Sequence, residues 1–505
     1  MGCCSACATG HNAGDAIPSR SPAPMSARQP APELTPALHW INADPLRLAA
    51  LRGRIVVLWF WHAGAVWCHN SLEDLRALQS RHGGSVCVIG IHVPKFDAER
   101  DPRQVLKAVN RHGIRFPVAS DGDWVAWQHF GIAGWPTTVL VDAAGCVRKV
   151  LAGDMRGSEL AQATAQLVAE AGGAEGALAE PFHAVQHPEG RHALAFPSGL
   201  AASASHLYVS DSAHHRILEC THDGHVVRQF GSGSAGFTDG DAAGAAFQSP
   251  RGLALMRNAL YVADTGNHAL RCVQLDSGEV VTAAGTGVAG IPRSGRTSDE
   301  ATPATGLPTL NAPWDVAAGN GHVYIAMAGA QQVWRYAPVG RELQPVAGSG
   351  HLGLADGVGE EAMFAQPAAL ALVQRTLYVA DAASSSIRSV HLGEGRGVQT
   401  LLGRGLFEFG DSDGTRSAAR LQAPAGLALD PSSPLLWIAD TGNDCLKVLR
   451  LGGGDLRRFD LEYRLHEPTA LAAHAGMLWL ANSAAHELLR VDVESGAVRR
   501  LPVGE

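Results

Sequence analysis

Cys68 stands between two histidines, His62 and His69, shortly after a continuous apolar run at residues 55–61. A thiol in such a setting can form a mixed disulfide with a partner or a sulfenic acid with peroxide. The three side chains are also zinc-ligand types, but a fourth ligand at a defined spacing is not visible, so we predict no metal here. Thiol chemistry is the first function that these residues suggest.

Three further cysteines, Cys3, Cys4 and Cys7, lie close to His11 at the start of the chain. Soft thiolates can bind zinc or copper, but nothing nearby supplies a fold or the supporting hydrogen bonds of a metal site. We therefore predict a reactive, unstructured tail, and we expect no cofactor.

The elements that must position Cys68 alternate between strand and helix patterns. The apolar runs at residues 55–61 and 85–92 are typical of buried parallel strands. Between them, residues 71–82 place leucines on one helical face, and a helical segment at 99–112 follows the second strand. The region closes with a hairpin at residues 137–151 and a helix from Ser158 to Ala171.

Six repeats follow, each with an apolar strand that opens on proline, a short turn and a strand led by an aromatic residue or leucine. Second strands such as LYVSD, LYVAD and LWIAD recur, and three inter-repeat loops echo one another as FTDGDAAGAAFQ, LADGVGEEAMFAQ and FGDSDGTRSAARLQ. This periodicity predicts a six-bladed β-propeller. The opening prolines are Pro197, Pro250, Pro313, Pro367, Pro424 and Pro468.

These patterns predict a multidomain chain with an α/β domain and an all-β propeller. We expect a disordered leader at residues 1–33, the α/β domain at residues 34–172, a linker at residues 173–182 and the propeller at residues 183–505. The leader is assigned from its Ala, Ser, Pro and Gly composition, which has no apolar period.

The composition and charge exclude two classes of partner. The strongest apolar run is too short to span a bilayer, and the N-terminus has no signal-peptide pattern, so no membrane association is expected. The whole net charge of −8 falls within residues 181–505, opposite in sign to a nucleic-acid-binding surface. Nine cysteines outside any disulfide framework predict reduced thiols and a cytoplasmic location. We also expect the protein to be a monomer.

Both halves resemble known proteins. The segments GRIVVLWFWHAGAVWCHNSLEDL and GIAGWPTTVLVDAAG are similar to the thioredoxin-like fold, and YVADTGNHALR at residues 261–271 closely resembles an NHL repeat. The order of the two parts resembles the NHL repeat-containing protein 2 family. The resemblance implies a thioredoxin-like domain followed by an NHL-repeat propeller.

Thioredoxin-type redox work needs two thiols two residues apart at the start of a helix. On alignment with that motif, the attacking position is Ala65 and only the second thiol, Cys68, is kept, so dithiol oxidoreductase activity is not expected. Cys68 is then either a relic thiol half-buried under the Trp67 loop or a reactive monothiol supported by His62 and His69.

Two further places are candidate binding sites. The resemblance implies that Pro136, after Trp135, is a cis proline, and this segment would pair with an extended peptide or would simply fix the entry of a strand. In the propeller, Trp314 and Asp315 replace the usual small residues at the start of an innermost strand. They mark either a pocket or local packing. The equivalent positions are Ser198, Arg251, Ala368, Ala425 and Thr469.

Three functions are therefore open. The first is a binding or scaffold module for a protein or peptide partner, with Trp67, Trp135, Pro136, Trp314 and Asp315 as contact residues. The second is a monothiol oxidoreductase or peroxide sensor acting through Cys68. The third, a metal-dependent propeller hydrolase, lacks support because the innermost strands carry no histidine and mostly small apolar residues.

Overall fold

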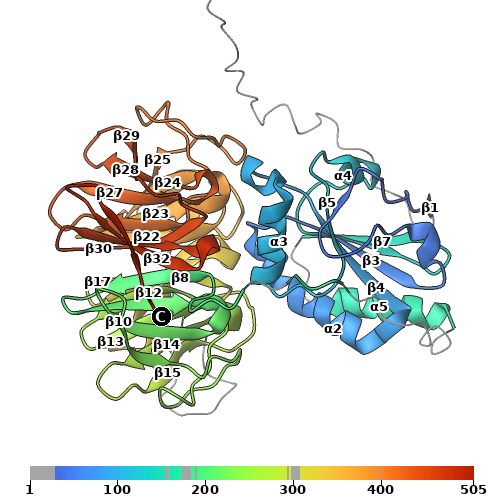
Figure 1. The fold of residues 1–505 in the computed structure, drawn as a ribbon, viewed down its shortest axis with the longest axis horizontal. Helices are drawn as coiled ribbons and strands as arrows, with labels where there is room; N and C mark the ends of the chain where they lie inside the picture. Colours follow the sequence, from blue (N-terminus) through green and yellow to red (C-terminus); the bar gives the residue numbers. More distant parts are fainter. Residues whose placement is uncertain are drawn as a thin grey trace, which may run out of the picture.

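The computed structural model of the chain describes residues 29–153, 158–172, 184–187, 190–292, 295–296, 308–395 and 397–504. The cysteine-rich tail, most of the predicted leader and the predicted linker lie outside these residues. Within them, a thioredoxin-like α/β domain is followed by a six-bladed β-propeller, as predicted (Figure 1). No helix in this described part is long and apolar enough to cross a membrane.

The α/β domain is built on a mixed sheet whose strand order is β1-β7-β6-β3-β4-β5-β2. At its centre, β3 pairs parallel with β4 and antiparallel with β6. Every residue of β3 and β4 is buried, because other elements cover both faces of a central strand. The strands are β1 Gln29–Pro30, β2 His39–Trp40, β3 Ile55–Trp61, β4 Val86–His92, β5 Val118–Ser120, β6 Thr137–Val141 and β7 Cys146–Ala152.

Helices pack on both faces of this sheet. One face contacts α2, α3 and α5, through leucines and valines such as Leu75 and Val105. The other contacts α4, whose Trp127 packs with Phe60 of β3. Asp101 caps α3, since its side chain accepts a hydrogen bond from the Arg103 amide. The helices are α1 Val66–Asn70, α2 Leu72–His82, α3 Pro102–Arg111, α4 Val125–His129 and α5 Ser158–Glu170.

The structured region begins earlier than residue 34. Strand β1 pairs with β7, and Ala31 donates a backbone hydrogen bond to Gly145. The Glu33 carboxylate accepts hydrogen bonds from the amides of Leu48 and Ala49. The composition of this segment does not indicate structure. The segment is ordered because it pairs with the distant hairpin that contains β7.

The propeller consists of six sheets, each built from strands that are consecutive in the described chain. Hydrophobic clusters join each blade to the next; one, for example, joins Phe230 to Leu260. The blades are β8–β11, β12–β15, β16–β20, β21–β25, β26–β29 and β30–β33.

The strands of the first three blades are β8 Pro197–Ala202, β9 His206–Asp211, β10 Arg216–Thr221, β11 Val226–Phe230, β12 Pro250–Met256, β13 Ala259–Asp264, β14 Ala269–Gln274, β15 Val280–Gly285, β16 Gly295–Arg296, β17 Pro313–Gly319, β18 His322–Met327, β19 Gln332–Ala337 and β20 Glu342–Ala347. Those of the last three are β21 Gly357–Val358, β22 Pro367–Val373, β23 Thr376–Asp381, β24 Ser386–His391, β25 Gly397–Leu402, β26 Gly426–Leu429, β27 Leu435–Asp440, β28 Cys445–Arg450, β29 Leu456–Phe459, β30 Pro468–His474, β31 Met477–Asn482, β32 Glu487–Asp492 and β33 Val498–Leu501.

One face of the propeller carries the starts of the innermost strands. In five blades, the opening proline pairs with the last residue of the second strand, as Pro250 does with Asp264. A 3-10 turn follows that residue, for example Thr265–Asn267 in the second blade. The strand starts and these turns therefore share one end of the ring, which we call the docking face. The thioredoxin-like domain lies beside this face, with α3 on the side toward the propeller (Figure 1).

Candidate functional site

The loop that connects β3 to α1 lies just before the candidate thiol, which is in α1, and the propeller covers this loop. Ala65 and Val66 are each only 1% exposed and Cys68 is fully buried, in a cluster that includes Trp59 and Leu72. Val66 packs instead against Ala312 of the docking face. The thiol therefore points into the core of its own domain, while the residues just before it meet the second domain.

The Gln366 side chain holds this loop from the propeller side. Its Oε1 accepts a hydrogen bond from the Val66 amide at 3.0 Å, and its Nε2 donates to the Gly64 carbonyl oxygen at 2.9 Å. These two bonds bracket Ala65, the attacking position of the motif. A further bond joins Asn70 Nδ2 to Asn311 Oδ1 at 3.1 Å. The edge of the domain where a substrate disulfide would approach is thus occupied by the same chain.

His62 lies on the other side of the loop and pairs with Glu99. The two side chains are 3.2 Å apart, and Glu99 also accepts hydrogen bonds from the amides of Gly64 and Lys95. Burial alone would raise the pKa of Glu99, but His62 and the backbone donors lower it to about 2. The Glu99 carboxylate therefore fixes the loop through charge-assisted hydrogen bonds.

Trp135 and Pro136 stand next to His62. The bond between them is cis, as the resemblance implied. The Trp135 ring is partly exposed and lies 5.1 Å from the His62 ring and 4.7 Å from the Trp127 ring. Pro136 itself is buried.

His69 faces the propeller. Its Nε2 hydrogen-bonds to the Ala63 carbonyl oxygen at 2.8 Å, and burial lowers its pKa to about 3. Its ring lies 3.9 Å from the His112 ring and stacks on Trp314 at 6.2 Å. Within the described residues, the ligand atoms of Cys68, His62 and His69 do not converge on a common point.

Trp314 and Asp315 lie on the docking face at different depths. Trp314, with Trp67 from α1, packs at the contact between the domains, and the Arg251 guanidinium lies 3.9 Å from the Trp314 ring centre. Asp315 lines the axial channel, where its Oδ2 accepts a hydrogen bond from the Leu370 amide at 2.7 Å. Burial raises the pKa of Asp315 to about 7. Trp314, but not Asp315, also lines a pocket of which the thioredoxin-like domain forms one wall.

That pocket is a cavity of about 360 Å³ between the domains. The thioredoxin-like domain contributes residues of α1, α2 and the end of α3, including Arg76 and Arg111. The propeller contributes the openings of its first, second, third and sixth blades, including Arg251.

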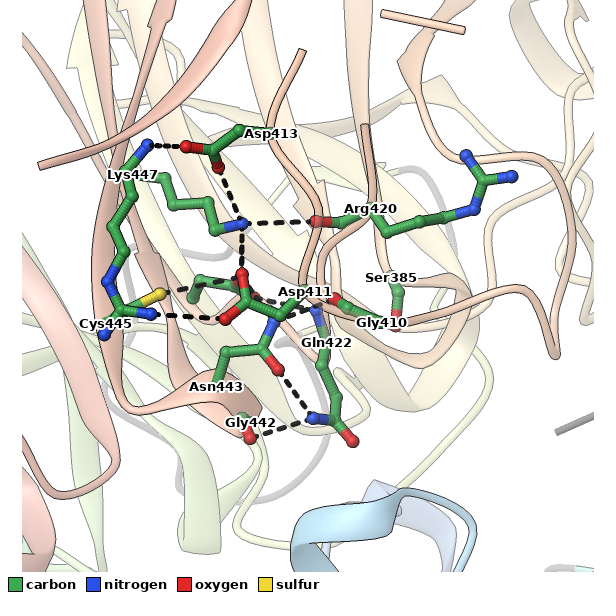
Figure 2. Close-up of polar contacts among 12 residues, drawn as sticks. Ser385, Gly410, Asp411, Asp413, Arg420, Gln422, Gly442, Asn443, Cys445 and Lys447 are labelled. Atoms are coloured by element: carbon green, nitrogen blue, oxygen red, sulfur yellow. Dashed lines mark hydrogen bonds and ion pairs between the residues drawn. The ribbon is translucent and has the colours of Figure 1, made fainter. Parts of the chain in front are cut away.

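A separate acidic group in the fifth blade has the residue types of a metal site. Asp411, Asp440 and Cys445 have ligand atoms within 4.8 Å of one another. The Lys447 ammonium lies among them, 2.5 Å from Asp411 and 3.2 Å from Asp413 (Figure 2). Arg271 and Arg388 occupy the same place in the second and fourth blades, each beside two aspartates. The group is an ion-pair network in which a side chain supplies the positive charge.

The strand-end aspartates of the repeats bind both the turn that follows them and the loop before their blade. Asp264 and Asp440 accept hydrogen bonds from the amides of Gln248 and Gln422. Asp381 likewise accepts from the Gln366 amide. These partners in the preceding loop lie more than a dozen residues away in the sequence, beyond the reach of a local turn pattern.

Sequence reasoning missed three glutamines that contact the thioredoxin-like domain. Besides Gln366, Gln248 Nε2 donates to Glu73 at 3.2 Å and Gln422 Oε1 accepts from the Asp97 amide at 3.0 Å. Each is the last residue of one of the three echoing inter-repeat loops. Their recurrence at one place in the repeat was the signal that could have found them.

Comparison with known proteins agrees with this architecture. Residues 14–167 match the Redoxin family model, and residues 247–273 match the NHL repeat model. NHL repeat-containing protein 2 of Gallus gallus is 30% identical over 526 residues, which cover 94% of this chain and 71% of that protein. The chain belongs to the NHL repeat-containing protein 2 family.

The family contains the two domains in the order seen here, and other relatives match one or both. Protein SUPPRESSOR OF QUENCHING 1, chloroplastic, of Arabidopsis thaliana is 34% identical over 442 residues, 83% of this chain but only 41% of that protein. Thiol-disulfide oxidoreductase YkuV of Bacillus subtilis (strain 168) is 24% identical over 129 residues, 26% of this chain and 87% of that protein. This member of the NHL repeat-containing protein 2 family thus spans less than half of the plant relative.

Proposed function

We propose that the protein is a binding protein rather than a dithiol oxidoreductase, with its two domains held together as one scaffold for a protein or peptide partner. The observation that carries the proposal is the covered motif loop: Gln366 brackets Ala65 with two hydrogen bonds, and Cys68 is fully buried. Thiol–disulfide exchange needs an attacking thiolate that a disulfide can reach. Ala65 has no thiol, and the propeller occupies the path to it.

The segment at Trp135 and Pro136 supports the choice of a peptide partner. Trp135 is partly exposed beside the buried cis proline. An extended peptide could pair with this segment by strand addition, and the partly exposed indole would contact its side chains.

A cytoplasmic, monomeric state belongs to the same proposal. Supporting it, the described residues contain no disulfide among their six cysteines, which are Cys68, Cys87, Cys146, Cys220, Cys272 and Cys445. Reduced thiols are typical of that compartment.

The test is alkylation of the folded protein with iodoacetamide, followed by mass spectrometry of each cysteine. We expect Cys68 to react far more slowly than the half-buried Cys146, and both to react fully once the protein is denatured. An assay of insulin disulfide reduction should find no turnover.

Rapid labelling of Cys68 in the folded protein, together with turnover of peroxide or glutathione disulfide that a Cys68→Ser variant lacks, would contradict the proposal. That result would establish the monothiol oxidoreductase or peroxide sensor as the function.

A further inference from the structure

The inter-domain cavity has the size and composition of a ligand site. Its volume of about 360 Å³ lies within the roughly 300–1,000 Å³ range of small-molecule pockets. Its lining includes three arginines and four histidines, whereas Glu73 is the one acidic residue among the described residues that line it. Such a wall favours an anion.

Two of the three arginines have acidic partners. Arg111 forms an ion pair with Glu467, and Glu73 acts on Arg76 with an attractive charge. Arg251 has no acidic partner among the described residues, and burial together with the charge of Arg111 lowers its pKa to about 9. At neutral pH the cavity therefore holds one unmatched guanidinium, which a bound anion would neutralise.

Two histidines of the lining offer further donors. His215 Nδ1 accepts a hydrogen bond from the Ser249 amide, and His268 Nδ1 accepts one from the Ala312 amide. Burial lowers the pKa of both rings, that of His268 to about 4, so they are neutral at pH 7. A neutral ring that accepts at Nδ1 carries its proton on Nε2. Neither Nε2–H has a partner within the part of the chain that the structure describes.

Flat aromatic groups form another part of the wall. The His69 ring lies between the rings of His112 and Trp314, and the Arg251 guanidinium lies over the Trp314 ring. The planar surfaces are thus next to the unmatched positive charge, as needed for a ligand that combines a ring with an anionic group.

We propose that this cavity binds a small organic anion, whose phosphate or carboxylate group is held by Arg251 with the Nε2–H groups of His215 and His268, and whose planar part lies along Trp314 and His69. The site goes beyond the proposed scaffold function and does not depend on it, because none of these groups requires Cys68 to be reactive or inert. Both domains contribute to it, so ligand occupancy also joins them.

The experiment is isothermal titration of the full chain with phenyl phosphate, with benzoate and with phenol as the uncharged analogue. We expect at least one of the two anions to bind with one site per chain, and phenol to bind at least about tenfold more weakly, as the loss of a charged hydrogen bond predicts. The better of the two anions identifies the phosphate or the carboxylate as the preferred group.

Arg251→Gln should weaken binding of that anion by at least about tenfold, whereas Arg375→Gln, at an exposed position, should leave it unchanged. Because Arg251 has no described acidic partner, the ligand-free Arg251→Gln variant should melt at the parental temperature or above. Arg251→Lys, which keeps the charge, should bind with intermediate affinity.

Failure of both anions to bind, or equal binding by the Arg251→Gln and Arg375→Gln variants, would overturn the proposal. A lower melting temperature of ligand-free Arg251→Gln, with anion binding unchanged, would instead make Arg251 a purely structural contact to Trp314. The alkylation of Cys68 is read separately, so the two proposals can fail independently.

Discussion

Asp315 links the stability of the propeller to pH through one carboxyl group in the axial channel. Burial raises its pKa to about 7, well above the value of an exposed aspartate. The native state then binds the Asp315 proton more tightly than the unfolded chain does. Its contribution to stability is therefore full below about pH 4 and is lost as the pH rises toward 7.

Asp315→Asn should remove this dependence, because an amide oxygen can still accept the hydrogen bond from the Leu370 amide. We expect the variant to melt above the parent at pH 8, and the difference to shrink at pH 5. Thermal unfolding followed by circular dichroism at both pH values checks this. Asp276→Asn, at an exposed position, is the control. A variant less stable than the parent at both pH values would contradict the expectation.

At the residue scale, the sequence could reveal which residues carry chemically active side chains, but not which side chains surround them in the fold. Trp314 and Asp315 stood out because they broke a repeated pattern of small residues, and both line the axial channel. Glu99 gave no such signal, since a carboxylate in a helical segment is ordinary. Its partnership with His62 exists only because the loop after β3 and the turn before α3 meet in the fold.

At the scale of elements, three loops of the propeller hold the thioredoxin-like domain through the side chain of their last residue. Gln366 makes the closest connection to the motif, with bonds on both sides of Ala65. A glutamine amide both donates and accepts, so one side chain can satisfy a carbonyl and an amide of the same loop. Loss of this side chain leaves both backbone groups without that partner.

Gln366→Ala should therefore loosen the loop without unfolding either domain. Removal of the partner of buried polar groups costs about 1–3 kcal/mol, which corresponds to acceleration of local opening by roughly fivefold to a hundredfold. We expect faster hydrogen exchange at residues 64–68 and faster alkylation of Cys68. Gln162→Ala, at an exposed position of α5, should change neither rate. Unchanged exchange in Gln366→Ala would mean that apolar packing alone closes the loop.

The elements themselves were largely predictable because their periodicities are strong. Strands β3 and β4, helix α2 and the six-fold repeat all follow from apolar spacing. Strands β1 and β2 were not predicted, because two-residue strands have no period and are defined by the sheet edge they join. The face of the propeller that receives the first domain was equally hidden, since it depends on contacts between distant segments.

At the scale of the whole molecule, α3 connects the domains through charged side chains. Lys107 Nζ donates to the Ala484 carbonyl oxygen at 2.9 Å, and Arg111 pairs with Glu467 while its guanidinium lies 4.7 Å from the Phe196 ring centre. Both members of the Arg111–Glu467 pair are mostly buried, with side chains about one-fifth exposed, and such a pair is costly to break from one side.

Glu467→Arg should therefore separate the domains, because it places two guanidinium groups together. We expect a larger radius of gyration in small-angle X-ray scattering and two thermal transitions in place of one. The double variant Arg111→Glu with Glu467→Arg restores opposite charges and should return both quantities toward the parental values. If the double variant behaves like the single one, the pair does not hold the domains together.

The contacts of α3 also matter for the ring itself. Since every blade is made of consecutive strands, the first and last blades are not joined by an exchanged strand in the described chain. Apolar packing, side-chain hydrogen bonds and the Arg490–Asp223 ion pair complete the circle there. Phe196 opens the first blade, while Glu467 and Ala484 belong to the last, so one short helix lies across this seam. The thioredoxin-like domain therefore connects the first and last blades of the propeller through α3. Release of this domain would remove the contacts that α3 makes on both sides of this junction.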